Sequence, residues 1–169
     1  MNSASVHEFY QGYLDKVKNG TVVENLIESG DKLSDLVLTI SEEQSMHAYD
    51  QGKWTIKELV QHMNDCERVF SYRALTFARN DHHDLPGFDE NTYAAESFAN
   101  ERKMSAILNE FHIVRAGSID LFSSFTSRVM DRKGTANGTE FSVELLGYII
   151  SGHTLHHLEI LKERYLDAN

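Results

Sequence analysis

The chain has 169 residues, 41% of them hydrophobic, which suits one domain with a substantial core. Its formal net charge of −10 argues against nucleic acid or an anionic membrane surface as a partner, because both carry negative charge. The sequence has no apolar run long enough for a membrane span, no leader-like start and a lone Cys66. These features predict a cytoplasmic protein.

Apolar residues recur at helical spacing in four stretches, and Pro86 is the single proline in the chain. An N-terminal extension, residues 1–20, precedes them and is predicted to form a short helix that ends near Gly20. A turn-rich segment, residues 131–138, separates the last two stretches. The predicted long helices cover, in chain order, residues 21–40, 55–79, 100–126 and 145–161.

Each of the four predicted helices carries one apolar stripe that must be buried against another element. The simplest arrangement is an all-α fold, a four-helix bundle with an additional short N-terminal helix. Residues 21–169 would form this bundle as one domain. Thr55 is a candidate N-cap with Glu58 three residues later, which is the capping-box pattern at the start of the second long helix.

The most informative motif is the segment from Gly152 to His157, because it places two histidines four residues apart in an apolar helical stretch. Positions i and i+4 share a helix face and differ by one turn of about 5.4 Å, so His153 and His157 can bind one ion. His62 is the other histidine within an apolar stripe. The spacing therefore predicts a transition-metal site formed by His62, His153 and His157.

A buried histidine taken alone is more often a hydrogen-bonded core residue than a metal ligand. Three buried imidazoles without a shared partner would leave polar atoms unsatisfied, at about 1–3 kcal/mol each, which favours a common ion. His156 lies to one side of His153 and is an alternative ligand. The other histidines lie in polar or peripheral positions, as His82 and His83 do, and are assigned no function.

Two carboxylates, Asp65 and Glu58, lie within about 60° of His62 around the second predicted helix. They are candidates for orienting an imidazole or accepting a proton, and solvated carboxylates at the edge of the stripe are an equally good interpretation. No other acid or base is evident beside the site.

Arg73 and Arg115 interrupt two of the apolar stripes. A buried guanidinium needs a partner, and an internal ion pair with a carboxylate such as Glu67 is favoured over binding of an external anion. Cys66 also lies in an apolar stripe, and packing is favoured for it over nucleophilic attack.

Several segments also resemble the DinB-like superfamily of metal-dependent proteins, in the subgroup of YfiT-type hydrolases. The resemblance extends over nearly the whole chain from Thr21 onward. It rests on the order of these segments and on the spacing between them. These segments are Gln51–His62, Glu67–Arg73, Pro86–Asn91, Glu110–Phe111 with Val114–Arg115, and Ser151–Leu158.

The resemblance implies a four-helix bundle that binds a divalent metal, most often zinc or nickel, through His62, His153 and His157. It also implies a homodimer. Nitrogen ligands accept iron as well, and three of them leave a coordination position open for water or a small-molecule substrate. A metal-activated water would make the protein a hydrolase.

Two alternatives to a hydrolase stay open. The resembled family includes metal-dependent transferases that join a low-molecular-weight thiol to an electrophile, in which the metal would hold a thiolate. The ion could instead serve a non-catalytic, stress-associated protein by tying the second long helix to the last.

Overall fold

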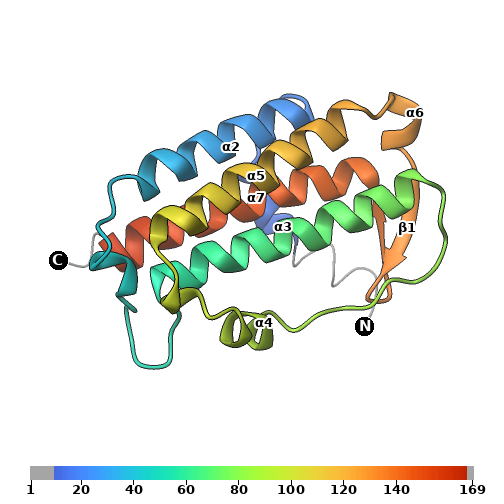
Figure 1. Cartoon of the computed structure of the whole chain (residues 1–169). Helices are drawn as coiled ribbons and strands as arrows, with labels where there is room; N and C mark the ends of the chain where they lie inside the picture. The colour runs from blue at the N-terminus through green and yellow to red at the C-terminus, as the bar shows by residue number, and fades with distance from the viewer. Residues whose placement is uncertain (1–9, 167–169) are drawn as a thin grey trace.

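A computed structural model describes residues 10–166 of the chain. Its four long helices form the predicted bundle, which confirms the fold class (Figure 1). Capping boxes at Thr21 and Thr55 begin the first two helices, as the pattern at Thr55 predicts. The long helices are α2 (Val22–Val37), α3 (Ile56–Ala78), α5 (Met104–Ser123) and α7 (Val143–Ile160).

Helix α5 is shorter than the predicted helix over residues 100–126. A 3-10 turn, η2 (Ala99–Glu101), precedes it, and extended backbone at Arg102 and Lys103 separates this turn from the helix. Helix α7 passes at its C-terminus into a π-helical turn, η3 (Leu161–Leu166). The short elements η1 (Gln44–Met46) and α6 (Ser127–Met130) lie in connections.

The described part of the N-terminal extension is helical over residues 10–14. This agrees with the predicted short helix, although the helix ends before Gly20 because the hydrogen bonds of Lys16 and Val17 are of the tighter i to i−3 type. The part of the prediction that falls on Phe9 lies outside the described residues.

The order of the helices around the bundle differs from a simple up-and-down arrangement. Helices α2 and α3 each pack against both α5 and α7, so the consecutive helices α2 and α3 lie diagonally opposite. Helices α3 and α5 run in the same direction, and the connection between them returns along the bundle (Figure 1). This connection, residues 79–103, contains the short helix α4 (Glu90–Glu96).

The turn-rich segment and the residues that follow it form a β-hairpin that the all-α prediction missed. Strands β1 (Lys133–Ala136) and β2 (Thr139–Ser142) pair antiparallel around Asn137 and Gly138, both with positive φ. An Asn-Gly pair with positive φ at both residues is typical of a type I′ hairpin turn. The α3–α5 connection docks on β1, because Leu85 exchanges backbone hydrogen bonds with Thr135 and Asn137.

The buried apolar residues form two clusters within the bundle. One includes Leu59 and Leu158, and the other includes Cys66 and Ile150. The face of α3 and α7 that joins the two clusters carries buried histidines at the positions between these residues. No helix among the described residues is long and apolar enough to cross a bilayer.

Candidate metal centre

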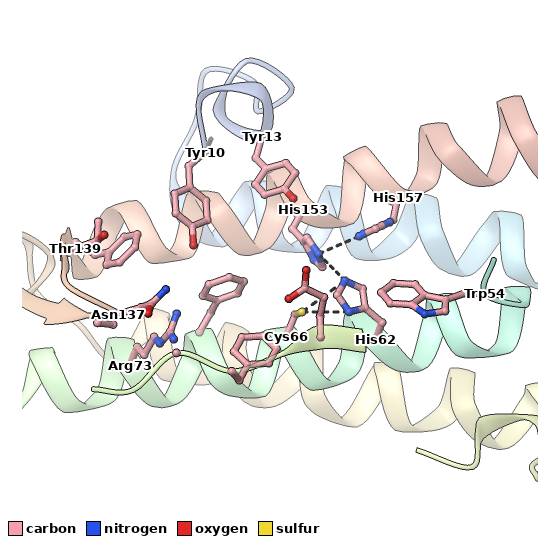
Figure 2. Close-up of a pocket in the computed structure, with 16 residues that line it drawn as sticks. Tyr10, Tyr13, Trp54, His62, Cys66, Arg73, Asn137, Thr139, His153 and His157 are labelled. Carbon is pink, nitrogen blue, oxygen red and sulfur yellow. Dashed lines mark hydrogen bonds between the residues drawn. The ribbon is translucent and has the colours of Figure 1, made fainter. Parts of the chain in front are cut away.

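Helices α3 and α7 pack side by side and bring the three predicted ligands together. His62 lies on α3, and His153 and His157 lie one turn apart on α7 (Figure 2). All three side chains are buried, with relative exposures of 7%, 6% and 8%. The structure therefore places the histidines on facing helix surfaces inside the bundle, as their periodicity predicts.

The imidazole rings point their Nε2 atoms at one another. His153 Nε2 is 3.1 Å from His62 Nε2 and 3.0 Å from His157 Nε2. One nitrogen of each of the three rings lies within 4.8 Å of the other two. Tetrahedral zinc with Zn–N bonds of about 2.0–2.1 Å places two ligand nitrogens about 3.3–3.4 Å apart, close to these separations. The donor set therefore fits a divalent transition metal.

The protonation state of the imidazoles also suits metal binding. Burial lowers the pKa of His62 to about 4, and burial lowers the pKa of His153 and of His157 well below the usual value. The rings are therefore neutral at pH 7, which is the form that binds a metal. The buried Nδ1 of His157 has no hydrogen-bond partner among the described residues.

Cys66 lies one helical turn after His62, with its Sγ 3.5 Å from His62 Nδ1. Burial raises the pKa of this thiol far above its ordinary value, so the sulfur stays protonated at neutral pH. A protonated, buried thiol is a poor nucleophile, which agrees with the predicted packing role.

A cavity of about 490 Å³ opens beside the histidines, a volume suited to a small molecule. Figure 2 shows the histidines and Trp54 toward one end and Arg73, Asn137 and Thr139 toward the other. Most of the lining is apolar or aromatic, and Glu90 at the start of α4 is the one carboxylate among the lining residues. The arrangement can hold an ion and a substrate next to each other.

The family assignment follows from a model of the DinB superfamily that matches residues 25–161. The chain belongs to the DinB superfamily. A solved structure with the same fold is that of YfiT from Bacillus subtilis, described as "a probable metal-dependent hydrolase with an unusual four-helix bundle topology". The match has a TM-score of 0.73 and 18% sequence identity, and it covers 84% of this chain and 82% of that chain. No curated protein gives a significant match.

The two candidate carboxylates, Asp65 and Glu58, make their contacts outside the cavity lining in this DinB superfamily member. Glu58 accepts a hydrogen bond from the backbone N–H of Thr55, which completes the capping box of α3. Asp65 accepts a hydrogen bond from Gln61 and lies 3.6 Å from Arg68. Neither carboxylate lines the cavity, so these contacts give no support to a role in catalysis or in orienting an imidazole.

The other histidines of the described residues lie apart from the three converging nitrogens. His156 contacts the rings of Tyr13 and His157 at its partly buried position, and its nitrogens do not join the cluster. His82 is exposed, and the exposed His83 pairs with Asp81. The preference for His153 and His157 over His156 follows from the i, i+4 geometry.

The predicted ion pair between Glu67 and an arginine is confirmed for Arg115. Arg115 donates from Nε and Nη2 to the two carboxylate oxygens of Glu67, at 2.8 and 2.9 Å. Its remaining donors reach Leu26 O, Ser29 Oγ and Thr154 Oγ1. The guanidinium thereby joins helices α2, α3, α5 and α7 beside the histidines.

The N-terminal segment covers the site from outside the region that the family model matches. Tyr10 and Tyr13 line the cavity, and the ring of Tyr13 packs edge-on against His153 at 5.5 Å (Figure 2). The backbone of Tyr13 passes so close to Gly152 on α7 that a Cβ there would lie 2.2 Å from the Tyr13 carbonyl oxygen. Glycine at this position permits the segment to lie over the histidines.

Gly152→Ala is expected to lower the free energy of unfolding by about 1–3 kcal/mol, the usual cost of overpacking, because backbone must move away. Gly117→Ala is the matched control, since Gly117 also lies in a helix and its added Cβ meets nothing within 4 Å. The control should gain about 0.5–1 kcal/mol through helix propensity. Urea unfolding measures both effects, and equal stability of the two variants would contradict the packing of Tyr13 on α7.

Two lining residues were missed or misjudged from the sequence. Glu90 follows the proline-containing turn, and its position in the cavity depends on the course of the α3–α5 connection. The sequence favours an internal ion pair for Arg73, yet this residue lines the cavity. The Asn-Gly pair at residues 137–138 was the local signal that could have predicted the hairpin.

Proposed function

We propose that this protein is a metal-dependent hydrolase that acts on a small molecule bound in the cavity. The observation that carries the proposal is the convergence of three neutral histidine nitrogens at the wall of a cavity large enough for a substrate. His62, His153 and His157 would hold the ion, with zinc or nickel as the preferred metals and iron as a third candidate. The likeness to YfiT supports this proposal through its shared fold.

Three protein ligands leave at least one position of the ion open, which is typical of a catalytic rather than a structural site. When bound, a divalent ion supplies Lewis-acid chemistry, since it lowers the pKa of water toward about 7 and polarises a carbonyl. The side chains that line the cavity would exclude bulk water and move the proton. Tyr13, Phe88 and Trp54 line the cavity and would limit the access of bulk water to the substrate.

Glu90 is the proposed proton acceptor for the attacking water. It is the carboxylate that lines the cavity. Burial is the main cause of the raised pKa values of Cys66, Tyr10 and Tyr13, and the charge of Glu90 adds a smaller contribution, which places this carboxylate near them. The side chain is exposed, so it can exchange protons with solvent. The same carboxylate would return the proton to the leaving group.

Glu90→Gln is expected to lower kcat by about 10²–10⁴-fold, the usual contribution of a general base, while bound metal stays unchanged. Glu96→Gln is the matched control, because Glu96 lies on the same short helix and does not line the cavity. Metal analysis and steady-state kinetics on both variants provide the measurement. A loss of activity shared by the two variants would remove Glu90 from the mechanism.

The proposed function is tested with protein that has been stripped of metal and reloaded separately with zinc, nickel or iron(II). Release of para-nitrophenol or para-nitroaniline from small aryl esters and amides is followed, with His153→Ala as the control. Hydrolysis that depends on the ion and on His153 would support the proposal. Loaded protein without turnover on any ester, amide or thiol acceptor would instead favour a non-catalytic metal-binding protein.

Thiol transfer is the second candidate function. The one cysteine, Cys66, is buried and protonated, so any thiolate at the site would have to come from a low-molecular-weight thiol. The cavity beside the histidines has the volume to admit one. Consumption of glutathione with an electrophile such as chlorodinitrobenzene, dependent on metal and on His153, would favour this reaction over hydrolysis.

The homodimer and the cytoplasmic location stay predictions. Light scattering would test the first against the mass of a single 19.3 kDa chain.

A further inference from the structure

Arg73 is a buried guanidinium with few partners. Its relative exposure is 4%, and it lines the cavity. Its Nη2 donates to the carbonyl oxygen of Pro86 at 3.0 Å, and this is its one hydrogen bond to the described residues. A guanidinium carries five N–H donors in a planar fork, so most of its donors are available toward the cavity.

Arg73 has far fewer hydrogen-bond partners than Arg115, which is buried in the same bundle. Arg115, which is equally buried, donates five hydrogen bonds and pairs with both oxygens of Glu67. Arg73 forms no ion pair with any carboxylate of the described residues. A buried cation without an anion is costly, and a ligand that brings the anion would remove that cost.

The surroundings of Arg73 suit the anionic end of a ligand. The guanidinium carbon lies 5.7 Å from the ring centre of Phe70 and 5.9 Å from that of Phe88, so aromatic rings hold it in place. Asn137 and Thr139 of the hairpin lie at the same end of the cavity and offer further polar atoms (Figure 2). The histidines lie toward the other end, with aromatic rings between the two groups.

We propose that Arg73 binds a carboxylate of the ligand, so that the cavity takes a small apolar or aromatic carboxylic acid derivative whose other end lies at the histidines. This inference rests on the proposed function for the reaction at that other end. Arg73 is the one cation among the lining residues, which matches a single negative charge better than a doubly charged phosphate. The planar fork suits the two oxygens of a carboxylate.

The proposal is tested by comparing phenylacetate with its neutral amide, phenylacetamide. Trp54 is the single tryptophan of the chain and lines the cavity, so its fluorescence reports binding directly. We expect phenylacetate to bind about ten- to a hundred-fold more tightly than phenylacetamide, the factor for a hydrogen bond to a charged group. Equal affinities, or no binding of phenylacetate at millimolar concentration, would overturn the proposal.

Three arginine variants test whether Arg73 causes the preference for the acid over the amide. Arg73→Met keeps an apolar side chain between Phe70 and Phe88 and should bind the acid and the amide equally. Arg73→Lys retains the charge and should retain part of the preference, so it tests the proposal even if the methionine variant does not fold. Arg79→Met is the control, because Arg79 is exposed and does not line the cavity, and it should behave as wild type.

His153→Ala separates this inference from the proposed function. A carboxylate could also bind to the ion, and in that case the preference would vanish in His153→Ala and persist in Arg73→Met, which would overturn the role of Arg73. A preference that persists in His153→Ala assigns the anion to Arg73. If that preference is present and no metal-dependent hydrolysis occurs, the proposed reaction fails while the carboxylate site stands.

Discussion

Replacement of His153 by alanine is expected to reduce the bound divalent metal from about one ion per chain to background. His153 is the central member of the cluster, since its Nε2 lies within 3.1 Å of His62 Nε2 and 3.0 Å of His157 Nε2. The variant keeps only two of the three converging histidine nitrogens. Elemental mass spectrometry on untagged protein, purified without chelator, measures the metal content.

The control for this measurement is His82→Ala. His82 is exposed, and it does not line the cavity, so its removal should leave the metal content unchanged. His62→Ala and His157→Ala should behave as His153→Ala does. Equal metal in all four variants would refute the assignment of the ligands.

Metal binding should also stabilise the native state, because the site exists only when α3 and α7 are packed together. A free ion at a hundred times its dissociation constant adds about 2.7 kcal/mol, which raises the Tm of a chain of this length by about 5–10 °C. Thermal unfolding with and without chelator measures the effect. The same treatment of His153→Ala should leave its Tm unchanged.

Arg115→Met is expected to lower the free energy of unfolding by about 3–5 kcal/mol, because it leaves the carboxylate of Glu67 buried without its partner. The exposed fractions of the two side chains are 5% and 3%, so solvent cannot replace the lost hydrogen bonds. The variant also removes the contact to Thr154, which follows His153 on α7. Urea unfolding provides the measurement.

The surface pair of Lys133 and Glu140 offers the control, since its side chains are 61% and 65% exposed. Lys133→Met should change the stability by no more than about 1 kcal/mol, as is usual for exposed pairs. Replacing both Glu67 and Arg115 by apolar residues should recover much of the loss, because no buried charge then remains. If Arg115→Met were as stable as Lys133→Met, the buried pair would not hold the four helices together.

The helices and the three histidines could be predicted from the sequence because both depend on local periodicity. The capping pattern at Thr55 and Glu58 begins α3, and the spacing of His153 and His157 places them on one face of α7. The apolar stripe around His62 predicts that this histidine also faces the core. These inferences need only the geometry of one helix at a time.

The candidate acid and base could not be predicted in this way. Asp65 and Glu58 share a helix with His62, and sequence proximity suggested them, yet their side chains bind neighbours on or near the helix surface. Glu90 reaches the cavity because α3 and α5 run in parallel, which forces their connection to return along the bundle (Figure 1). No local pattern carries that information.

The sequence by itself therefore determined the helices, their buried faces and the three histidines, since each follows from spacing along one helix. Only the tertiary structure decided which helices are neighbours and that Glu67 pairs with Arg115 and not with Arg73. It also decided that the N-terminal segment and the hairpin line the cavity. The physical reason is that an amphipathic face specifies burial without specifying its partner. The choice of partner depends on packing between residues far apart in the chain.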